Sequence, residues 1–419
     1  MRPVARTNWA GNYTYGARHV HMPKQLEEAQ EIISRAERIH VLGSGHSFTS
    51  IVDSAELISL EALPVHCEVD RATRTVTASG TMRYGQLAKA LQRADLALPN
   101  LASLPHIAVA GAVQTATHGS GNGNGNLATS VTAIEFVRSD GELVSIARGD
   151  PDFEGVVVGL GAIGAVVRIT LDVEPAYEVR QWVFEGLSWA SLSEHLDEIM
   201  AAGYSVSAFT LWGEDIHQLW IKRRAGEDPP PNSLFGARAA PANRHPIPGL
   251  DPANCTPQLG ETGPWFDRLP HFRMGFTPSS GAEIQSEYLV PRAQGAPAIE
   301  AVRALSRLVG PLVQVSELRS VAADSLWLSP QYEADTLGIH FTWRQRQREV
   351  ERALVEVEAA LRPLGARPHW GKLFLGKAGP MYPRLPDFED LRRRLDPRGA
   401  FQNRWLERHL TAAREPSPD

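Results

Sequence analysis

The chain has 419 residues, of which 43% are hydrophobic and 21% are charged, and its formal net charge is −6. This length allows two or three domains with a core that needs no disulfide or metal, and the composition excludes disordered, fibrous and disulfide-rich proteins. The weak acidity, without a block of Lys or Arg, excludes a nucleic-acid-binding face or a polybasic membrane patch and favours a small-molecule partner.

Two features of the sequence predict a cytoplasmic protein. The two cysteines, Cys67 and Cys255, are too few for a disulfide framework or a cysteine-based zinc site, which is typical of a reducing compartment. The start of the chain lacks the apolar segment of an export signal, and the longest apolar run, 155–167, is shorter than the ~20 residues that span a membrane. We therefore expect neither a membrane partner nor a metal site.

Up to about residue 175, short β-rich runs alternate with one helical stretch at 84–98. The stretch 131–146 predicts a hairpin whose turn is Asp140-Gly141, and 165–179 predicts a long strand that ends at Pro175. The remaining β-rich runs are 39–45, 57–63 and 74–80. This pattern indicates an α+β or α/β domain with a boundary near residue 175.

A second unit extends from residue 180 to about 375. Its predicted helices are 191–203 and 348–365, and its predicted strands are 207–213, 284–290, 312–321 and 338–343. Between Pro229 and Pro264 lie nine prolines, which exclude a helix or a central strand from residues 226–265. This segment is either an ordered excursion over an entrance or a disordered insertion. The apolar tail 396–410 must dock elsewhere on the protein.

Gly159, Gly161 and Gly164 match the G-x-G-x-x-G pattern of a dinucleotide-binding turn. In a Rossmann fold this turn follows the first strand and opens a helix, whose N-terminus meets the pyrophosphate. Here the β-branched run that begins at Ala165 follows, and the motif falls late in its domain. The sequence therefore predicts a strand after the turn and no nicotinamide site.

Two other glycine-rich segments suit a phosphate better. Residues 42–47 follow an apolar strand directly and form a tight turn whose backbone N–H groups can face an anion. Residues 100–121 bring Thr115, Thr117 and His118 together with several glycines. Neither segment contains a Walker lysine, so we expect a dinucleotide held mainly by backbone and hydroxyl groups.

Six segments in chain order carry a resemblance to a known family. They are GSGHSF (43–48), NLASLPHIAVAG (100–111), TATHGSG (115–121), VGLGAIGAV (158–166), HWGKLF (369–374) and DPRGAFQNRWL (396–406). Together they resemble FAD-linked oxidases of the vanillyl-alcohol oxidase type, and within these the alditol (xylitol) oxidases. The resemblance implies an α+β, two-domain PCMH-type fold: an FAD-binding domain from residues 1–178 and 377–419, and an inserted antiparallel-sheet cap from 179–376.

The resemblance also makes His46 the site of a covalent bond to the flavin 8α-methyl group. A neutral imidazole is a suitable nucleophile for that reaction, and the tether would raise the flavin's reduction potential. Without the resemblance, a histidine that only hydrogen-bonds within its turn is the simpler interpretation. The expected FAD-binding residues are Val41, Leu42, Gly43, Ser44, Gly45, His46, Ser47, Ser103, Ala108, Gly111, Thr115, Thr117, His118, Val166 and Lys372.

Strand alternation places polar pairs on one face of the second unit. Glu317 and Arg319 are two residues apart and so share a face, as do His340 and Thr342. The same alternation in 369–374 would place Lys372 between two aromatic side chains. Taken alone, each pair is compatible with a solvated or cross-strand role, and Lys372 with an edge residue. Alditol oxidases are expected to place such a set over the flavin: Ser103, Glu317, Arg319, His340, Thr342 and Lys372.

Oxidation of a primary alcohol removes a hydroxyl proton and a hydride from C1, so it uses a base and cations near the developing alkoxide. His340 is the base candidate, with Arg319 and Lys372 as the cations. Ser103, Glu317 and Thr342 would hold the other hydroxyls of a linear polyol. Only five residues are lysines, against 37 arginines, so a lysine at this position stands out.

We therefore expect a monomeric, FAD-dependent oxidase of xylitol, sorbitol or similar polyols that reduces O2 to H2O2. Ala102 matches the position beside the flavin that gates oxygen in this superfamily. Three alternatives stay open: an aldonolactone oxidase or dehydrogenase, a silent polyol- or flavin-binding protein, and a nicotinamide-dependent dehydrogenase.

Overall fold

The N-terminal half begins with a small parallel sheet and a helix that covers it. The computed structural model describes residues 6–273, 275 and 283–410. The first sheet has the order β1-β3-β2, formed by β1 (His19–His21), β3 (Glu56–Ile58) and β2 (Ile39–Val41). Helix α1 (Leu26–Arg35) buries Ala29 and Ile33 in one apolar cluster with residues of this sheet.

A second, antiparallel sheet of five strands has the order β4-β5-β9-β7-β8. Its strands are β4 (Cys67–Asp70), β5 (Thr75–Ser79), β9 (Ala165–Asp172), β7 (Val131–Val137) and β8 (Leu143–Ala147). The elements around it are α2 (Tyr84–Arg93), β6 (Leu96–Ala97), α3 (Val109–Gln114), α4 (Phe153–Val157) and β10 (Glu174–Pro175). The predicted hairpin is confirmed as β7 and β8, with Gly141 at φ +88° in the turn.

The glycine-rich turn at 158–164 leads directly into strand β9, as predicted. Leu160 and Gly161 take left-handed φ values of 55° and 72° there. Because no helix opens at this turn, its N–H groups cannot form the helix-terminal anion site of a Rossmann fold. This turn is therefore not a Rossmann-type nicotinamide site.

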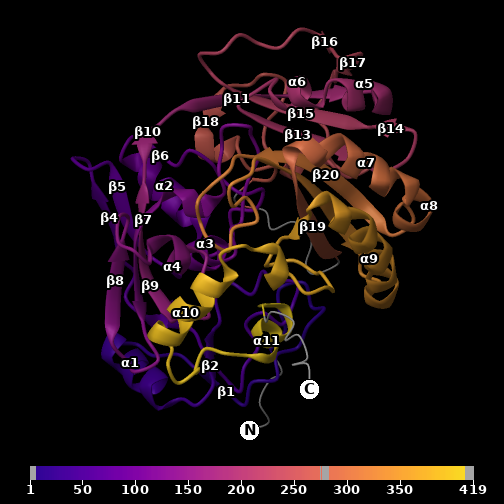
Figure 1. The fold of residues 1–419 in the computed structure, drawn as a ribbon. Helices are drawn as coiled ribbons and strands as arrows, with labels where there is room; N and C mark the ends of the chain where they lie inside the picture. The colour runs from indigo at the N-terminus through magenta and orange to yellow at the C-terminus, as the bar shows by residue number, and fades with distance from the viewer. Residues whose placement is uncertain (1–5, 274, 276–282, 411–419) are drawn as a thin grey trace, which may run out of the picture.

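The second half is built around a sheet of ten strands (Figure 1). Its path is β16-β17-β11-β15-β13-β20-β21-β19-β22, and β18 pairs with β11 at the side. The long strands are β11 (Glu178–Glu185), β15 (Gln218–Arg224), β13 (Ser205–Thr210), β20 (Val313–Val321), β21 (Thr336–Arg344) and β19 (Glu283–Pro291). Its short strands are β16 (Ser233–Leu234), β17 (Ala237–Ala239), β18 (Gly263–Pro264) and β22 (Arg367–Pro368). Strands β12 (Leu187–Ser188) and β14 (Asp215–Ile216) form a separate pair.

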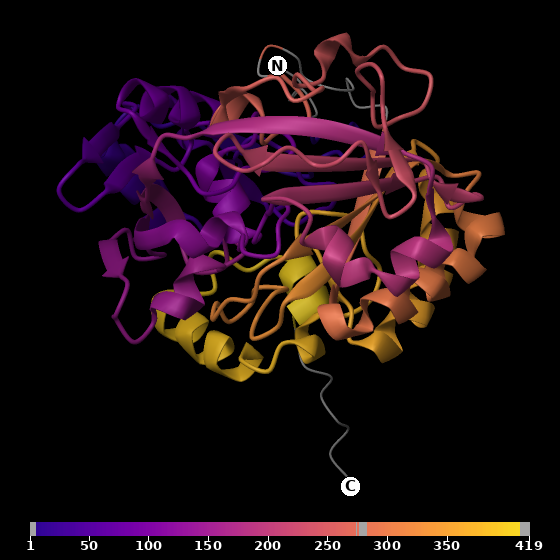
Figure 2. The ribbon, with the colours of Figure 1, turned by 90° about the horizontal axis from the view of Figure 1, so that it is seen from above.

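Five helices lie along the outer side of this sheet (Figures 1 and 2). They are α5 (Trp189–Glu194), α6 (Leu196–Met200), α7 (Gly295–Ala304), α8 (Ser306–Val309) and α9 (Gln347–Leu361). Helix α9 confirms the prediction for 348–365. The prediction of one helix over 191–203 is wrong, because His195 has φ −122° and separates α5 from α6.

The proline-rich segment 226–265 is an ordered excursion. It contains β16 (Ser233–Leu234), β17 (Ala237–Ala239) and β18 (Gly263–Pro264), and both β17 and β18 pair with β11 at the sheet edge. Short 3-10 helices follow at Pro252–Asn254 and Trp265–Asp267.

The C-terminal tail docks on the N-terminal half, as the family resemblance implies. Its helices α10 (Leu385–Leu395) and α11 (Arg404–Leu410) are seen in yellow beside the indigo part of the chain in Figure 1. Ile39 N donates to Ala400 O at 2.8 Å, and Phe401 is buried in the cluster of helix α1. The limits 1–178, 179–376 and 377–419 of the expected domains stay a prediction.

No helix in the described ranges is long and apolar enough to cross a membrane.

Candidate active site

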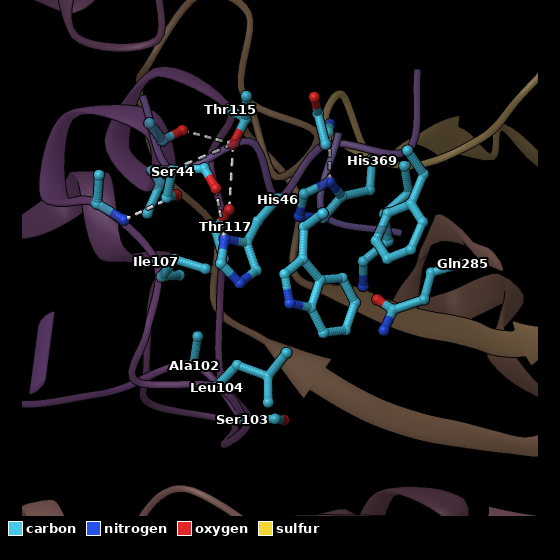
Figure 3. A pocket seen from close by; sticks show the side chains of 18 of the residues that line it. Ser44, His46, Ala102, Ser103, Leu104, Ile107, Thr115, Thr117, Gln285 and His369 are labelled. Atoms are coloured by element: carbon cyan, nitrogen blue, oxygen red, sulfur yellow. Dashed lines mark hydrogen bonds between the residues drawn. The ribbon is translucent and has the colours of Figure 1, made fainter. Parts of the chain in front are cut away.

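One cavity of about 460 Å³ lies between the two halves of the protein and takes side chains from both. Every predicted FAD-binding residue and every predicted catalytic residue lines it. Figure 3 shows His46 between Thr117 and Ile107 on one side and Gln285 and His369 on the other. Residues of the proline-rich excursion also reach the cavity, namely His245, Pro246, Ile247 and Leu250.

The turn after strand β2 forms the first wall. Residues 43–47 line the cavity, and Gly45 takes φ +68°, which favours glycine. Within the described part of the chain, no protein acceptor is found for the backbone N–H groups of these residues. Ser44 Oγ is used internally, since it accepts from Ala108 N at 3.2 Å. A run of N–H groups at a cavity wall fits the pyrophosphate of FAD.

One ring nitrogen of His46 is within hydrogen-bond distance of a protein atom, and the other has no such partner among the described residues. Its Nδ1 lies 3.1 Å from Ser44 O, whereas its buried Nε2 has no hydrogen-bond partner among the described residues. Trp9 stacks on the ring at 5.1 Å between centroids. Burial lowers the pKa of His46 to about 4, so the imidazole is neutral. A neutral ring with an unpartnered nitrogen at the cavity fits a covalently bound cofactor.

Small and hydroxylic residues continue this wall. Thr115 Oγ1 and Thr117 Oγ1 lie 3.1 Å apart, and Ala108 and Val166 are buried beside them at the cavity. A Cβ added to Gly111 would meet no protein atom within 4 Å, so its open side faces free space. The wall therefore offers room and neutral polar groups, which suit a flavin ring system and its phosphates.

The opposite wall is the inner face of strands β20 and β21. Glu317 pairs in register with His340, and Arg319 and Thr342 follow at the next positions on the same face. All four are at most 8% exposed. Arg319 Nη1 lies 3.5 Å from Ser103 Oγ, which joins this wall to the loop that carries Ala102. The structure thus brings together all six residues of the predicted catalytic set.

Glu287, on strand β19, is the centre of the wall and was not predicted. Its side chain is fully buried and accepts from Arg319 Nη2 at 2.6 Å and from Lys372 Nζ at 2.5 Å. His118 Nε2 lies 3.4 Å from the same carboxylate. Burial opposes ionisation, but Arg319 and Lys372 hold the pKa of Glu287 well below its ordinary value. The carboxylate is therefore a fixed anion between Arg319 and Lys372.

Lys372 also contacts His340. Its Nζ lies 2.9 Å from His340 Nδ1, while His340 Nε2 lies 3.1 Å from Thr342 Oγ1. Burial, with help from Lys372, lowers the pKa of His340 to about 4. Burial likewise lowers the pKa of Lys372, although Glu287 opposes this shift. The two groups form a hydrogen-bonded pair that can share one proton.

The strand predicted for 369–374 is wrong. Strand β22 ends at Pro368, and Lys372 N donates to His369 O in a turn at 3.0 Å. Trp370 and Phe374 instead pack edge-on with Trp405, away from the lysine. The turn, rather than a strand face, directs Lys372 to Glu287.

His118, Glu287 and His369 place three ligand atoms within 4.8 Å of one another. Metal sites are built from such atoms, but this carboxylate already contacts Lys372 and the guanidinium of Arg319, whose charge would repel a further cation. The cluster is better suited to holding the side chains of the wall.

Comparisons with known proteins agree with this geometry. A family described as FAD binding domain matches residues 17–147, and one described as D-arabinono-1,4-lactone oxidase matches residues 281–409. An alditol oxidase from a Streptomyces species is 47% identical over 411 residues, covering 96% of this chain and 98% of that protein. An L-gulono-1,4-lactone dehydrogenase from Mycobacterium tuberculosis is 27% identical and covers 98% of this chain and 100% of its own.

Solved structures share the fold at low sequence identity. The cholesterol oxidase from B. sterolicum superposes with a TM-score of 0.78 at 15% identity, covering 97% of this chain and 96% of that chain. The predicted α+β fold of the PCMH type, with two antiparallel sheets, is confirmed.

Proposed function

Because the chain belongs to the alditol oxidase family of FAD-dependent oxidoreductases, we propose that it oxidises the terminal primary alcohol of a linear polyol to the aldose. Xylitol and sorbitol are the expected substrates, and O2 is the acceptor. The observation that carries the proposal is the wall of Glu317, Arg319, His340, Thr342 and Lys372, which faces the FAD-binding turn across one cavity.

The residues that would hold FAD are 41–47, Ser103, Ala108, Gly111, Thr115, Thr117, His118, Val166 and Lys372. Its attachment through His46 to the 8α-methyl group is part of the proposal, supported by the neutral ring and the unpartnered Nε2. When bound, FAD supplies the acceptor for the hydride from C1 and the means to reduce O2 to H2O2. Ala102, 7% exposed and at the cavity, is the proposed oxygen gate.

His340 and Lys372 take the hydroxyl proton together. His340 can accept the proton at Nε2 only if the single N–H proton of its neutral ring lies on Nδ1. That N–H then donates to an unprotonated Lys372. The ring then passes its Nδ1 proton to Lys372, which ends as an ammonium beside the Glu287 carboxylate. The mechanism requires Lys372 to start unprotonated: burial lowers the pKa of both groups in that direction, and Glu287 opposes the shift of Lys372.

The other polar residues hold the polyol. Arg319 lies between Glu287 and Glu317, so its guanidinium is fixed and can stabilise the developing alkoxide. Glu317, Thr342 and Ser103 offer acceptors and hydroxyls to the remaining hydroxyl groups. A substrate that lacks those hydroxyls would leave buried polar groups unpaired and would bind poorly.

The domain limits, the oligomeric state and the location of the protein are also part of the proposal. We propose that residues 1–178 with 377–419 form the FAD-binding domain, that 179–376 form the cap, and that the protein works as a monomer in the cytoplasm. Support comes from the return of the tail to β2 and from the completion of the cavity within one chain.

Substrate screening tests the activity. Xylitol and sorbitol should release H2O2 and should bleach the flavin under nitrogen. The lactone family match at 281–409 makes gulono- and galactono-lactone the necessary comparison. Turnover of the lactones alone would contradict the proposal, and the absence of bleaching by any polyol would indicate a silent binding protein.

The tether has its own test. After acid precipitation of the wild-type protein, the yellow colour should stay in the pellet, and His46→Ala should release it to the supernatant. His40→Ala is the matched control, because His40 is also buried at the cavity and its pKa is also lowered to about 4. Colour retained by His46→Ala would refute the attachment.

A further inference from the structure

A line of buried hydrogen bonds continues behind the catalytic wall. Lys222, on strand β15, is 1% exposed, and His271, which follows the proline-rich excursion, is 5% exposed. Neither residue takes part in the chemistry proposed above. His271 nevertheless lines the cavity and contacts Glu317, one of the residues that would hold substrate hydroxyls.

The contacts place His271 between the amine of Lys222, whose pKa burial lowers to about 7, and the carboxylate of Glu317. Its Nε2 lies 2.8 Å from Glu317 Oε1, and its Nδ1 lies 3.4 Å from Lys222 Nζ. Lys222 Nζ also donates to the carbonyl oxygens of Leu269 and, at 3.3 Å, Pro270. The edges of Phe209 and Trp220 pack against the imidazole and fix its plane.

The chemistry of these groups fixes the imidazole tautomer. An ionised carboxylate only accepts hydrogen bonds, and a lysine ammonium only donates them. Burial raises the pKa of Glu317, but Arg319 and His271 lower it further, so the carboxylate is ionised. His271 must therefore carry its proton on Nε2 and present a bare Nδ1 to Lys222.

This arrangement leaves one carboxylate oxygen of Glu317 available to accept a further hydrogen bond. Oε1 is occupied by His271, whereas Oε2 lies 3.6 Å from Arg319 Nε, beyond ordinary hydrogen-bond distance. An acceptor of this kind at the cavity wall can take a substrate hydroxyl only if the carboxylate keeps its orientation. His271 is the group that sets that orientation from the side away from Arg319.

We propose that Lys222 and His271 are positioning residues: Lys222 fixes the tautomer and place of His271, and His271 holds Glu317 toward the non-reacting hydroxyls of the polyol. This inference rests on the proposed function. It predicts an effect on the binding of substrates with neighbouring hydroxyls rather than on the chemical step. A role in folding alone would affect all substrates equally.

Two amides at position 271 separate these roles. In His271→Gln the side-chain NH2 can reach the place of Nε2 and donate to Glu317, whereas the shorter side chain of His271→Asn reaches only the place of Nδ1. Binding is measured by calorimetry with xylitol and the reduced holoenzyme under nitrogen, where no turnover occurs. The kcat and KM for xylitol and for 1,3-propanediol, which has no adjacent hydroxyls, complete the comparison.

We expect His271→Asn to weaken xylitol binding by about tenfold or more, since a hydrogen bond to a charged group is lost. The kcat should stay within about threefold, kcat/KM for 1,3-propanediol should be unchanged, and His271→Gln should restore most of the affinity. Lys222→Met should act in the same direction as His271→Asn and more weakly, by about threefold, since it removes an indirect support.

His217→Leu is the matched control. Its Nε2 lies 3.0 Å from Pro246 O, so it also supports the excursion, but its side chain does not line the cavity. It should leave xylitol binding within twofold. The inference is overturned if His271→Asn binds xylitol like the wild type, if the diol loses as much as xylitol, or if His217→Leu has the same effect. A wild-type holoenzyme that binds no xylitol would overturn the proposed function itself, and the inference with it.

Discussion

The two walls of the cavity bind by different means. The wall from the N-terminal half presents glycines, backbone N–H groups and threonine hydroxyls, and the imidazole of His46 on it is neutral. The opposite wall, from the large sheet and the turn after β22, presents Glu287, Glu317, Arg319 and Lys372, whose side chains are at most 13% exposed and contact one another. One wall is shaped mainly by the backbone, and the other by charge.

This difference determines how each wall responds to substitution. Backbone N–H groups are present whatever the side chain, so the first wall is sensitive mainly to added volume. In the second wall each charge is compensated by its neighbours in a medium of low dielectric constant, so a single change alters all of them. The predictions below test that contrast, from the largest expected effect to the smallest.

Lys372→Arg should reduce kcat/KM for xylitol by about 10²- to 10⁴-fold, the usual contribution of acid–base catalysis. Arginine keeps the positive charge but cannot lose its proton, so it cannot receive the Nδ1 proton of His340. The measurement is steady-state H2O2 release. Lys377→Arg, the same change at an exposed lysine, is the control. Wild-type rates in Lys372→Arg would show that the position needs only a charge.

Glu287→Gln should lower kcat by about ten- to a hundredfold and destabilise the fold, because it leaves Arg319 and Lys372 buried without their shared anion. Glu358→Gln is the matched control, since Glu358 accepts from Tyr288 and from two backbone N–H groups outside the main cavity. Thermal unfolding of both variants separates lost stability from lost turnover.

Glu287→Gln should also shift the pH dependence of kcat/KM in one direction. The His340–Lys372 pair accepts the substrate proton only when unprotonated, so kcat/KM should rise with pH as the pair loses its proton. Glu287 raises the pKa of Lys372. Its removal should therefore move the rise of kcat/KM to lower pH. A shift to higher pH, or none, would contradict the role of Lys372 as proton acceptor.

Gly111→Ala should lower the flavin content of the purified protein by about fivefold or more, because the added methyl group occupies space at the cofactor wall. The fold should not suffer, since alanine favours helix α3 over glycine. Gly123→Ala, where a Cβ also meets no protein atom within 4 Å but lies outside the cavity lining, is the control. Flavin content is read from absorbance at visible and ultraviolet wavelengths.

The sequence predicted the elements whose patterns are local. Alternation in β20 and β21 gave the face that carries Glu317, Arg319, His340 and Thr342, and the dipeptide Asp140-Gly141 marked its hairpin. The prediction for 369–374 failed because six alternating residues also fit a turn. The unbroken helix predicted over 191–203 failed because tertiary packing can stop a helix without a proline or glycine.

Glu287 and His271 were not predicted from the sequence, for different reasons. Glu287 could have been found, because it lies two residues from Gln285 on a predicted strand, and the alternation used for β20 and β21 applies there too. His271 lies in an irregular segment with no period, so no pattern links it to Glu317. Its role depends on a contact between segments 46 residues apart.

The return of the C-terminal tail sets the order of events during synthesis. Arg38 donates to Gly399 O, a contact between residues 361 positions apart. At about 5–20 residues per second, a ribosome needs roughly 20 to 70 s to join these partners. The last strand of the large sheet ends at Pro368, 31 residues before Gly399, so at the same rate it is synthesised about 2 to 6 s earlier. The N-terminal half, where the chain begins, is thus the last part to be completed.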